Sequence, residues 1–260
     1  ASSLGSSLGG GMIGGKVLPL PTACSGCPAA SSAQGFVPPS GPTDARLAIV
    51  GQGPGYDEAA LGEPFVGPSG RHLNKWLAKA GVPREKCAVS NVVWCHLPKN
   101  RKPTPKEIAH CWEAHVGPHL RSLPNLRVIV AAGVPAAQKF IRGAKQSTTG
   151  TVAPFQLDDR TVYVIPIVHP AAIIRGQWEY DPAQPRYLRR AWSIATSEEF
   201  PPNLLDVTVP PPGGKIAKTV HEVAAFLGDI LIDGCAVACD IEGTGGVLIG
   251  IGFTRMDTLA

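Results

Sequence analysis

The stretch that decides the fold is RLAIVGQGPG, residues 46–55, in which a short apolar run ends at a Gly/Pro turn. Such a run is typical of a strand that is buried on both faces of a parallel sheet. Three further runs have the same form: CAVSNVVW (87–94), LRVIVAAG (126–133) and TVYVIPIVHP (161–170). The sequence therefore predicts a core built on parallel strands.

Helical patterns separate these apolar runs. They cover residues 69–81, 104–123 and 134–143, and residues 182–197 predict a closing helix. Thr104 is suited to cap the second of these helices, with Glu107 three residues later as its capping-box partner. Strands that alternate with helices predict a three-layer α/β/α fold around a central, mostly parallel sheet.

Composition suggests where the domains begin and end. Residues 1–19 are rich in Ser and Gly and predict a disordered tail, and residues 20–200 form the α/β domain. PPNLLDVTVPPPGGK (201–215) holds five prolines and two glycines, which is typical of a linker. Residues 216–260 predict a helix (219–231) and two strands within 235–254, as at the start of an incomplete second α/β domain.

Charge and cysteine content narrow the class of protein. Residues 1–200 carry 21 Lys and Arg against 13 Asp and Glu, a net charge of +8 that suits a polyanion such as nucleic acid. The chain has no secretory pattern and no apolar run of membrane-spanning length, so we expect a cytoplasmic protein of a bacterial or phage-infected cell without membrane partners. Seven cysteines in that setting favour a metal or cluster site over disulfides.

The ends of the predicted strands carry the candidate site. Ligands of open parallel sheets bind beyond the carboxyl ends of the strands. Gly51–Gly53, Phe65, Asn91 and His169 all lie at or soon after such ends. Taken singly, they are a tight turn, a core aromatic ring, a buried amide and a structural histidine. Only their order along the chain gives them a shared meaning.

Four segments occur in the order found in a known family. They are GQGPGYDEAALGEPFVGPSGRHLNKWLAKAG, SNVVWCHLPKNRKPTPKEIAHC, VIVAAGVPAAQKF and VHPAAIIR, and the resemblance they carry covers roughly residues 20–195. This arrangement resembles the family-4 uracil-DNA glycosylases, the iron–sulfur members of that superfamily. The resemblance implies the superfamily's α/β/α fold. It also implies hydrolysis of the N-glycosidic bond of deoxyuridine in DNA, which leaves an abasic site.

The resemblance assigns roles to the strand-end residues. Phe65 would stack on the extruded uracil, and Asn91 would read the Watson–Crick edge of that base. His169 would donate a hydrogen bond to uracil O2 as negative charge develops on the leaving base. The backbone of Gly51–Gly53 would line the pocket.

The resemblance also implies contacts with DNA. The segment after His169 is where the family inserts an apolar wedge, so Ile173 or Ile174 would fill the space that the base leaves, and Arg175 would hold a phosphate. Further phosphate contacts are expected from Lys99, Arg101 and Lys102. The alternative for these three is a solvated basic loop.

Gln52 is a departure from the family, which usually has Glu at this position. Glutamine can orient a water molecule but cannot accept its proton near neutral pH. Asp57 and Glu58 either compensate for it or are ordinary acids on the solvent side. We therefore expect slower excision or altered specificity. The alternative is a catalytically weak module that binds uracil or DNA for an attached polymerase.

Four cysteines match the family's cluster ligands. The resemblance implies that Cys24, Cys27, Cys95 and Cys111 hold a 4Fe–4S cluster, which requires four thiolates. A four-cysteine zinc site has the same ligand count, so a zinc-stabilised nucleotide-binding domain without glycosylase activity is a rival hypothesis. Cys87 begins a buried strand and is interpreted as a small apolar residue.

A second resemblance lies in VACDIEGTG (237–245). Asp240 and Glu242 look like the first motif of DnaQ-like 3′–5′ exonucleases, and strand alternation puts them on one face, as shared Mg²⁺ binding requires. Two acids so spaced at the end of a strand are also common without function. The other acidic motifs are not present in these residues, so this site is incomplete. We interpret the chain as a piece of a longer protein, a phage-type DNA polymerase with a fused glycosylase domain.

Overall fold

The computed structural model describes residues 17–197, 236–244 and 247–256. The chain divides into two compact units, residues 1–201 and 202–260, and each is described by itself. The first unit holds a five-stranded sheet covered by helices, and the second holds a two-stranded hairpin.

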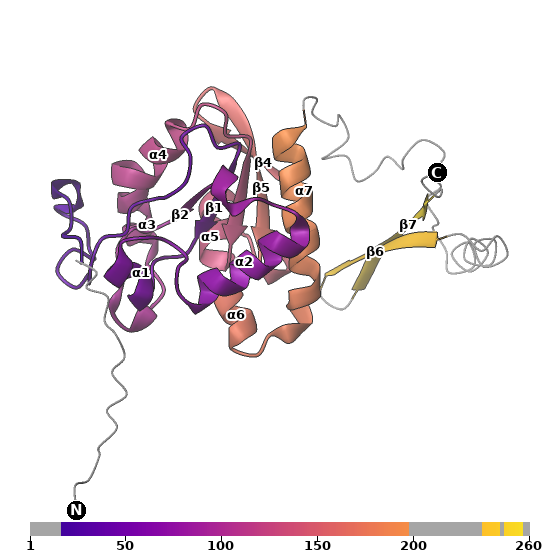
Figure 1. The fold of residues 1–260 in the computed structure, drawn as a ribbon, viewed down its shortest axis with the longest axis horizontal. Coiled ribbons are helices and arrows are strands. Elements are labelled where there is room, and N and C mark those ends of the chain that lie inside the picture. The colour runs from indigo at the N-terminus through magenta and orange to yellow at the C-terminus, as the bar shows by residue number, and fades with distance from the viewer. Residues whose placement is uncertain (1–16, 198–235, 245–246, 257–260) are drawn as a thin grey trace, which may run out of the picture. The chain divides into compact units, whose positions relative to one another are not determined.

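The sheet of the first unit has the strand order β2–β1–β3–β5–β4 (Figure 1). Neighbours among β2, β1, β3 and β5 are parallel, whereas β4 runs antiparallel to β5 at the edge. The strands are β1 (Leu47–Gly51), β2 (Cys87–Asn91), β3 (Val128–Ala132), β4 (Ala153–Leu157) and β5 (Arg160–Ile167). The mostly parallel sheet and its four expected strands are confirmed. β4 was not expected, because its APFQL sequence is half exposed and forms no apolar run.

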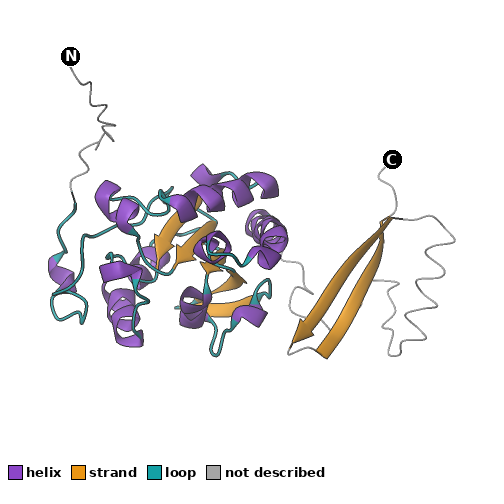
Figure 2. Ribbon diagram, turned by 90° about the horizontal axis from the view of Figure 1, so that it is seen from below, coloured by secondary structure: helices purple, strands orange, loops and turns teal. Residues whose placement is uncertain are grey.

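Helices cover both faces of this sheet (Figure 2). They are α1 (Tyr56–Leu61), α2 (Pro68–Ala80), α3 (Pro105–Cys111), α4 (Gly117–Arg121), α5 (Val134–Phe140), α6 (Pro170–Ile174) and α7 (Gln184–Thr196). On one face, Val50 and Ile129 of the sheet share an apolar cluster with Leu120 of α4 and Phe140 of α5. On the other face, α7 contacts β1, β3 and β5 and packs against α2. The predicted three-layer α/β/α architecture is therefore correct.

The helix expected over residues 104–123 is present but is not regular. Thr104 caps α3 as predicted, because its Oγ1 accepts the Glu107 N–H and the Glu107 carboxylate accepts the Thr104 N–H. A π-helical turn, Trp112–Val116, separates α3 from α4. Pro118 lacks an N–H to continue the α-helical pattern across this point, which is a physical reason for the irregularity.

The N-terminal segment runs along the edge of the sheet that β2 forms. Ser40 and Val89 of β2 exchange two backbone hydrogen bonds, and Phe36 forms an antiparallel bridge with Cys95. Gly41 has φ +106, and a Cβ there would lie 2.2 Å from the Cys87 carbonyl oxygen, so this close approach requires glycine. The N-terminal segment and the residues after β2 therefore meet beside Cys95.

The second unit contains the strands expected there. β6 (Ala236–Thr244) and β7 (Val247–Met256) form an antiparallel pair with a register shift after Glu242. The side chains of these strands, and with them the proposed roles of Asp240 and Glu242, lie outside what the structure describes. The same holds for tail residues 1–16, the linker over 201–215 and the helix expected over 219–231.

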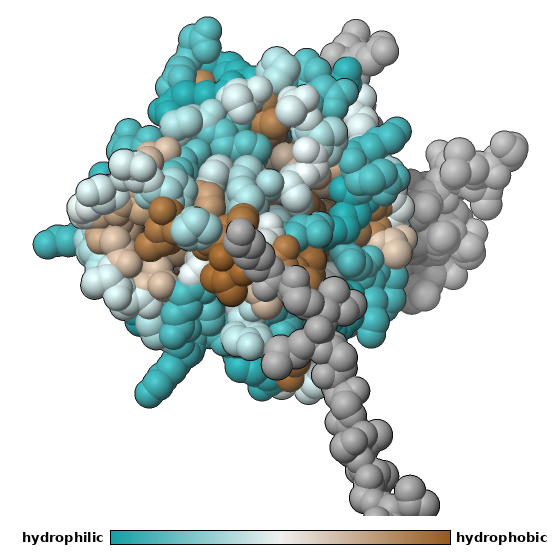
Figure 3. Space-filling view, turned by 60° about the vertical axis from the view of Figure 1, so that its left-hand side comes forward, coloured by the Kyte–Doolittle hydropathy of each residue, from teal (hydrophilic) through white to brown (hydrophobic). Residues whose placement is uncertain are grey.

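The surface of the described part is mostly polar. Figure 3 shows a face on which hydrophilic side chains surround smaller apolar areas. The large apolar side chains that are exposed are Val17, Tyr56, Leu61, Ile174 and Trp178. In the described ranges, every helix is too short or too polar to cross a lipid bilayer.

Candidate active site

A cavity of about 820 Å³ opens at the carboxyl ends of the parallel strands. β1 and β3 are neighbours, but the chain continues from β1 to β2 on one side and from β3 to β4 and β5 on the other. Such a switch point is where open α/β sheets bind ligands. Gly51 is paired with Asn91 in the β1–β2 register, so both strands end at the same level. The topology alone therefore creates the opening.

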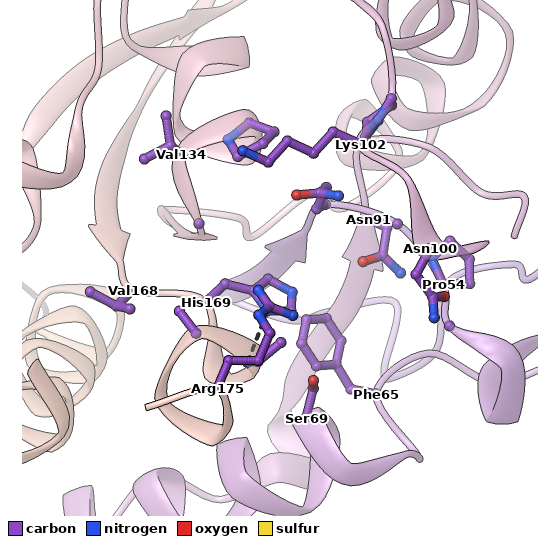
Figure 4. Close-up of a pocket in the computed structure, with 18 of the residues that line it drawn as sticks. Pro54, Phe65, Ser69, Asn91, Asn100, Lys102, Val134, Val168, His169 and Arg175 are labelled. Atoms are coloured by element: carbon purple, nitrogen blue, oxygen red, sulfur yellow. Dashed lines mark hydrogen bonds between the residues drawn. The ribbon is translucent and has the colours of Figure 1, made fainter. Parts of the chain in front are cut away.

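The structure brings the main predicted residues to this one cavity. Gln52, Phe65, Asn91 and His169 all line it. The Phe65 ring faces the His169 imidazole with a centroid separation of 6.1 Å and an interplanar angle of 28° (Figure 4). Phe65 and Asn91 are otherwise buried, with exposed fractions of 5% and 3%. A cavity lined by an aromatic ring, an amide and an imidazole suits a planar heterocycle.

Two glycines let these side chains meet. A Cβ on Gly51 would lie 2.5 Å from Asn91 Oδ1 and 2.5 Å from Phe65 Cζ. Gly133 has φ +90, and a Cβ there would lie 2.9 Å from His169 Cβ. Sequence reasoning missed Gly133, although its place directly after the third apolar run is a signal that would have found it.

The hydrogen bonding of His169 fixes its tautomer. Its Nδ1 accepts the backbone N–H of Ala171 at 3.1 Å, as the N-cap of α6. In the neutral ring the proton therefore lies on Nε2. Burial, and then the nearby charge of Arg175, lower the pKa of His169 from 6.5 to about 4. At neutral pH the ring is thus an uncharged hydrogen-bond donor.

The two acids near Gln52 have different surroundings. Glu58 is buried, and its carboxylate accepts the N–H of Gly55 at 3.1 Å and the N–H of Gly67 at 2.8 Å. The interpretation of Glu58 as a solvent-side acid was wrong, because this side chain ties together the two loops that frame the cavity. Asp57 is partly exposed and lines the cavity, as Gln52 does.

Basic side chains surround the cavity mouth. Lys99, Arg101, Lys102 and Arg175 line it as expected, and Lys145 joins them. In Figure 4 the Lys102 side chain reaches across the opening toward Val134. Arg101 is different, since its guanidinium binds Glu107 through contacts of 2.9 and 2.6 Å and lowers the pKa of that carboxyl to about 2. Arg101 thus helps to hold the basic loop.

Only one of the two candidate wedge residues is accessible. Ile173 is fully buried beneath α6, which rules it out as a wedge in this conformation. Ile174 is 44% exposed and lines the cavity beside Arg175. The expectation therefore narrows to Ile174.

The four candidate ligand cysteines surround one small cavity next to the first. Cys24, Cys27, Cys95 and Cys111 all line it. Burial is the main cause that raises the pKa of Cys95 and of Cys111 to about 12, so thiolates there need a positively charged group. Within the described ranges, no three Cys, His, Asp or Glu side chains are grouped to hold a single metal ion. Cys87 lies apart, buried at the start of β2.

Trp94 connects the two cavities, which sequence reasoning did not foresee. Its indole Nε1 donates to Ser90 Oγ at 2.9 Å and to the Asn91 carbonyl at 3.1 Å. Its backbone N–H donates to Cys111 Sγ at 3.3 Å, and its ring stacks on His115, whose Nε2 lies 3.2 Å from Cys24 Sγ. One side chain thus contacts both the end of β2 and the surroundings of the cysteines.

Comparison with known proteins points to one family. Residues 38–196 match the model of the uracil DNA glycosylase superfamily. The chain is 36% identical to the type-4 uracil-DNA glycosylase of Thermotoga maritima, over 59% of this chain and 79% of that protein. It is also 36% identical to the type-4 enzyme of Archaeoglobus fulgidus, over 61% of this chain and 84% of the relative. The type-4 enzyme of Pyrobaculum aerophilum is 31% identical, over 58% and 80%. The matched region contains most of the cavity lining.

Proposed function

The chain belongs to the uracil DNA glycosylase superfamily, and from this premise we propose that it hydrolyses the N-glycosidic bond of deoxyuridine in DNA. Such a DNA glycosylase acts in base excision repair and leaves an abasic site. The observation that carries the proposal is the meeting of Phe65, Asn91 and His169 in one cavity at the strand ends.

Base recognition is assigned to Phe65 and Asn91. A glycosylase cannot reach its bond inside a stacked duplex, so the nucleotide is extruded or taken from a single strand. The Phe65 ring then stacks on the base, and the Asn91 amide accepts from N3–H and donates to O4. Cytosine offers the opposite pattern at these two atoms and is disfavoured. The backbone of Gly51–Gly53 closes the pocket around the base.

His169 is assigned to the leaving group. As the bond between C1′ and N1 breaks, its electron pair moves to the base, and negative charge grows on O2. The neutral imidazole donates its Nε2–H to that oxygen, and loss of such a donor typically costs about 10²–10³-fold in rate. A water molecule adds to C1′. Gln52 orients this water but does not take its proton, which passes to solvent.

DNA binding is assigned to the rim of the cavity. Lys99, Lys102 and Arg175 contact phosphates, and Arg101 supports them through its ion pair with Glu107. Ile174 enters the space that the extruded base leaves. The exposure of these side chains around the opening supports this part of the proposal.

We propose that Cys24, Cys27, Cys95 and Cys111 hold a 4Fe–4S cluster. Four thiols around one cavity match the four thiolates that such a cluster requires. Bound there, the cluster would supply the positive charge that these thiolates require, and the hydrolysis itself needs no electron transfer. Iron and sulfide analysis, with visible absorption, separates the cluster from zinc.

The remaining proposals rest on the sequence. Residues 216–260 are proposed as the start of a DnaQ-like exonuclease domain, in which Asp240 and Glu242 bind Mg²⁺. A DNA polymerase or exonuclease continuous with this chain is the proposed partner, in the cytoplasm of a bacterial or phage-infected cell. An antiparallel strand pair that carries both acids on β6 agrees with such a start.

The test is a single-turnover excision assay on the full chain, purified without oxygen. Labelled single- and double-stranded DNA each carry one uracil, and His169→Ala and Phe65→Ala are the controls. Abasic product that depends on His169 supports the proposal. Tight uracil-dependent binding without product favours a second candidate, a uracil reader, for which Gln52 is the specific observation. If the protein shows neither abasic product nor uracil-dependent binding, both candidate functions are wrong.

A further inference from the structure

Phe65 has a backbone conformation that its residue type rarely adopts. Its φ is +56°, in the left-handed region, although the residue is neither Gly nor Asn. Such a conformation costs on the order of 1–3 kcal/mol and persists only where surrounding groups impose it. The residue is also only 5% exposed, and its ring faces the His169 imidazole. The ring's position therefore depends on whatever holds this backbone.

One side chain binds the backbone of this segment directly. Arg84 Nη2 donates to the carbonyl of Pro64 at 3.1 Å and to the carbonyl of Phe65 at 3.3 Å. On the other side, the first turn of α2 fits against the same carbonyl, since a Cβ on Gly70 would lie 1.7 Å from Phe65 O. The Phe65 peptide is thus held between a guanidinium and a helix.

Arg84 is poorly satisfied where it lies. It lies in the short 3₁₀ turn (Arg84–Lys86) before β2 and is partly buried. Its Nη1 is buried and makes no hydrogen bond within the described part of the chain. Burial is the main cause that lowers its pKa, and Glu63 opposes that effect. A buried donor without a partner costs free energy, so the placement of this guanidinium is not explained by stability alone.

We propose that Arg84 is a positioning residue for base recognition, which holds the Phe65 backbone so that the ring stays stacked opposite His169. This inference rests on the proposed function, because the ring's partner is the extruded uracil. When the guanidinium is absent, residue 65 relaxes to negative φ, and its side chain leaves the direction that keeps it over Gly51. The protein still folds and reacts, but it captures the extruded base less often.

The experiment compares Arg84→Met and Arg84→Lys with the unaltered full chain in single-turnover excision at varied enzyme concentration. Arg84→Met is expected to raise the half-saturating concentration about 10-fold, since stacking of a base on an aromatic ring contributes roughly that much or more. The maximal rate should change less than about 3-fold, because stacking on Phe65 stabilises the bound substrate and the transition state about equally. Arg84→Lys keeps a positively charged donor group without the guanidinium fork and should recover part of the loss.

Arg160→Met is the matched control. Arg160 also binds backbone carbonyls, those of Leu120, Arg121, Leu123 and Pro124, but it begins β5, whose opposite end reaches the cavity. This variant is expected to lower the unfolding temperature and leave the half-saturating concentration unchanged. A variant that is only less stable contains less active protein, so the amplitude of the excision reaction falls while the half-saturating concentration stays the same. Measuring the unfolding temperature and the half-saturating concentration together therefore distinguishes lower stability from weaker base capture.

The double variant Phe65→Ala/Arg84→Met decides how Arg84 acts. If Arg84 works through Phe65, removing it from the Phe65→Ala protein changes the half-saturating concentration less than about 2-fold. An equal loss in both backgrounds, or no loss in the single variant, overturns the inference. An unaltered protein without any excision would instead overturn the proposed function, so the two failures are distinct.

Discussion

The charge state of His169 leads to a prediction about pH. Its pKa of about 4, against an ordinary 6.5, corresponds to about 3 kcal/mol against the imidazolium form. Between about pH 7.5 and 5.5 an ordinary histidine goes from about 10% to about 90% protonated, whereas His169 stays below about 5% protonated. We therefore expect the single-turnover excision rate to show no step near pH 6.5 in either direction.

The cause lies in the ring's surroundings. Protonation would place a second N–H on Nδ1, opposite the N–H that Ala171 already directs at it. Arg175 adds a smaller repulsion, so Arg175→Met should raise the pKa of His169 but leave it below 6.5, because burial is the larger cause. The sign for stability follows: as pH falls from about 6.5 toward 4, only the unfolded chain takes up this proton, so the free energy of unfolding decreases.

The assay measures excision at saturating enzyme across this range, with folding checked by circular dichroism at each pH. Nitrogen NMR of histidine-labelled protein reports the tautomer and pKa of the ring directly. His169→Gln identifies the origin of any step, because other histidines are present. A step near pH 6.5 that disappears in His169→Gln would refute the reasoning. A step that persists in this variant would arise elsewhere.

The other predictions concern single side chains. Gln52→Glu should raise the maximal excision rate by about 10²-fold, the usual contribution of a general base, and an unchanged rate in single-turnover assays would show that position 52 does not limit chemistry. Trp94→Phe should lower the free energy of unfolding by about 1 kcal/mol in urea titrations, because Ser90 and Asn91 lose their shared donor, and intact visible absorption would show that the cysteine site is preserved. Lys99→Ala and Lys102→Ala should each reduce the slope of log affinity against log salt by about 1 in DNA-binding titrations, and an unchanged slope would place that lysine away from phosphate.

The fold was predictable where burial leaves a continuous apolar run. Residues 47–50 and 128–132 are completely buried, so their composition alone marks them as central strands. β4 escaped because an edge strand needs only one apolar face, and Pro154 argues against a strand. The helices α1 and α6 were not predicted from the sequence, because each is shorter than two full turns and directly follows a strand-end loop.

The site was predictable only in part. Phe65, Asn91 and His169 were found from the order of the motifs. The contacts of Glu58, Arg84 and Trp94 were not predicted, because each side chain forms a hydrogen bond with a backbone group of another residue. A side chain that binds a main-chain N–H or carbonyl leaves no pattern in either partner's residue type. Only the folded geometry reveals such contacts.

The N-terminal segment along β2 also bears on self-association. A free edge strand presents unpaired backbone groups that can join the sheet of another molecule. Here Ser40 occupies that edge at Val89, and Phe36 continues the pairing beside Cys95. In the proposed cluster-bound protein, Cys24 and Cys27 attach this N-terminal segment to the domain. Loss of the cluster would release the N-terminal segment and expose the edge of β2. Oxidative damage to the cluster would therefore favour aggregation as well as inactivation.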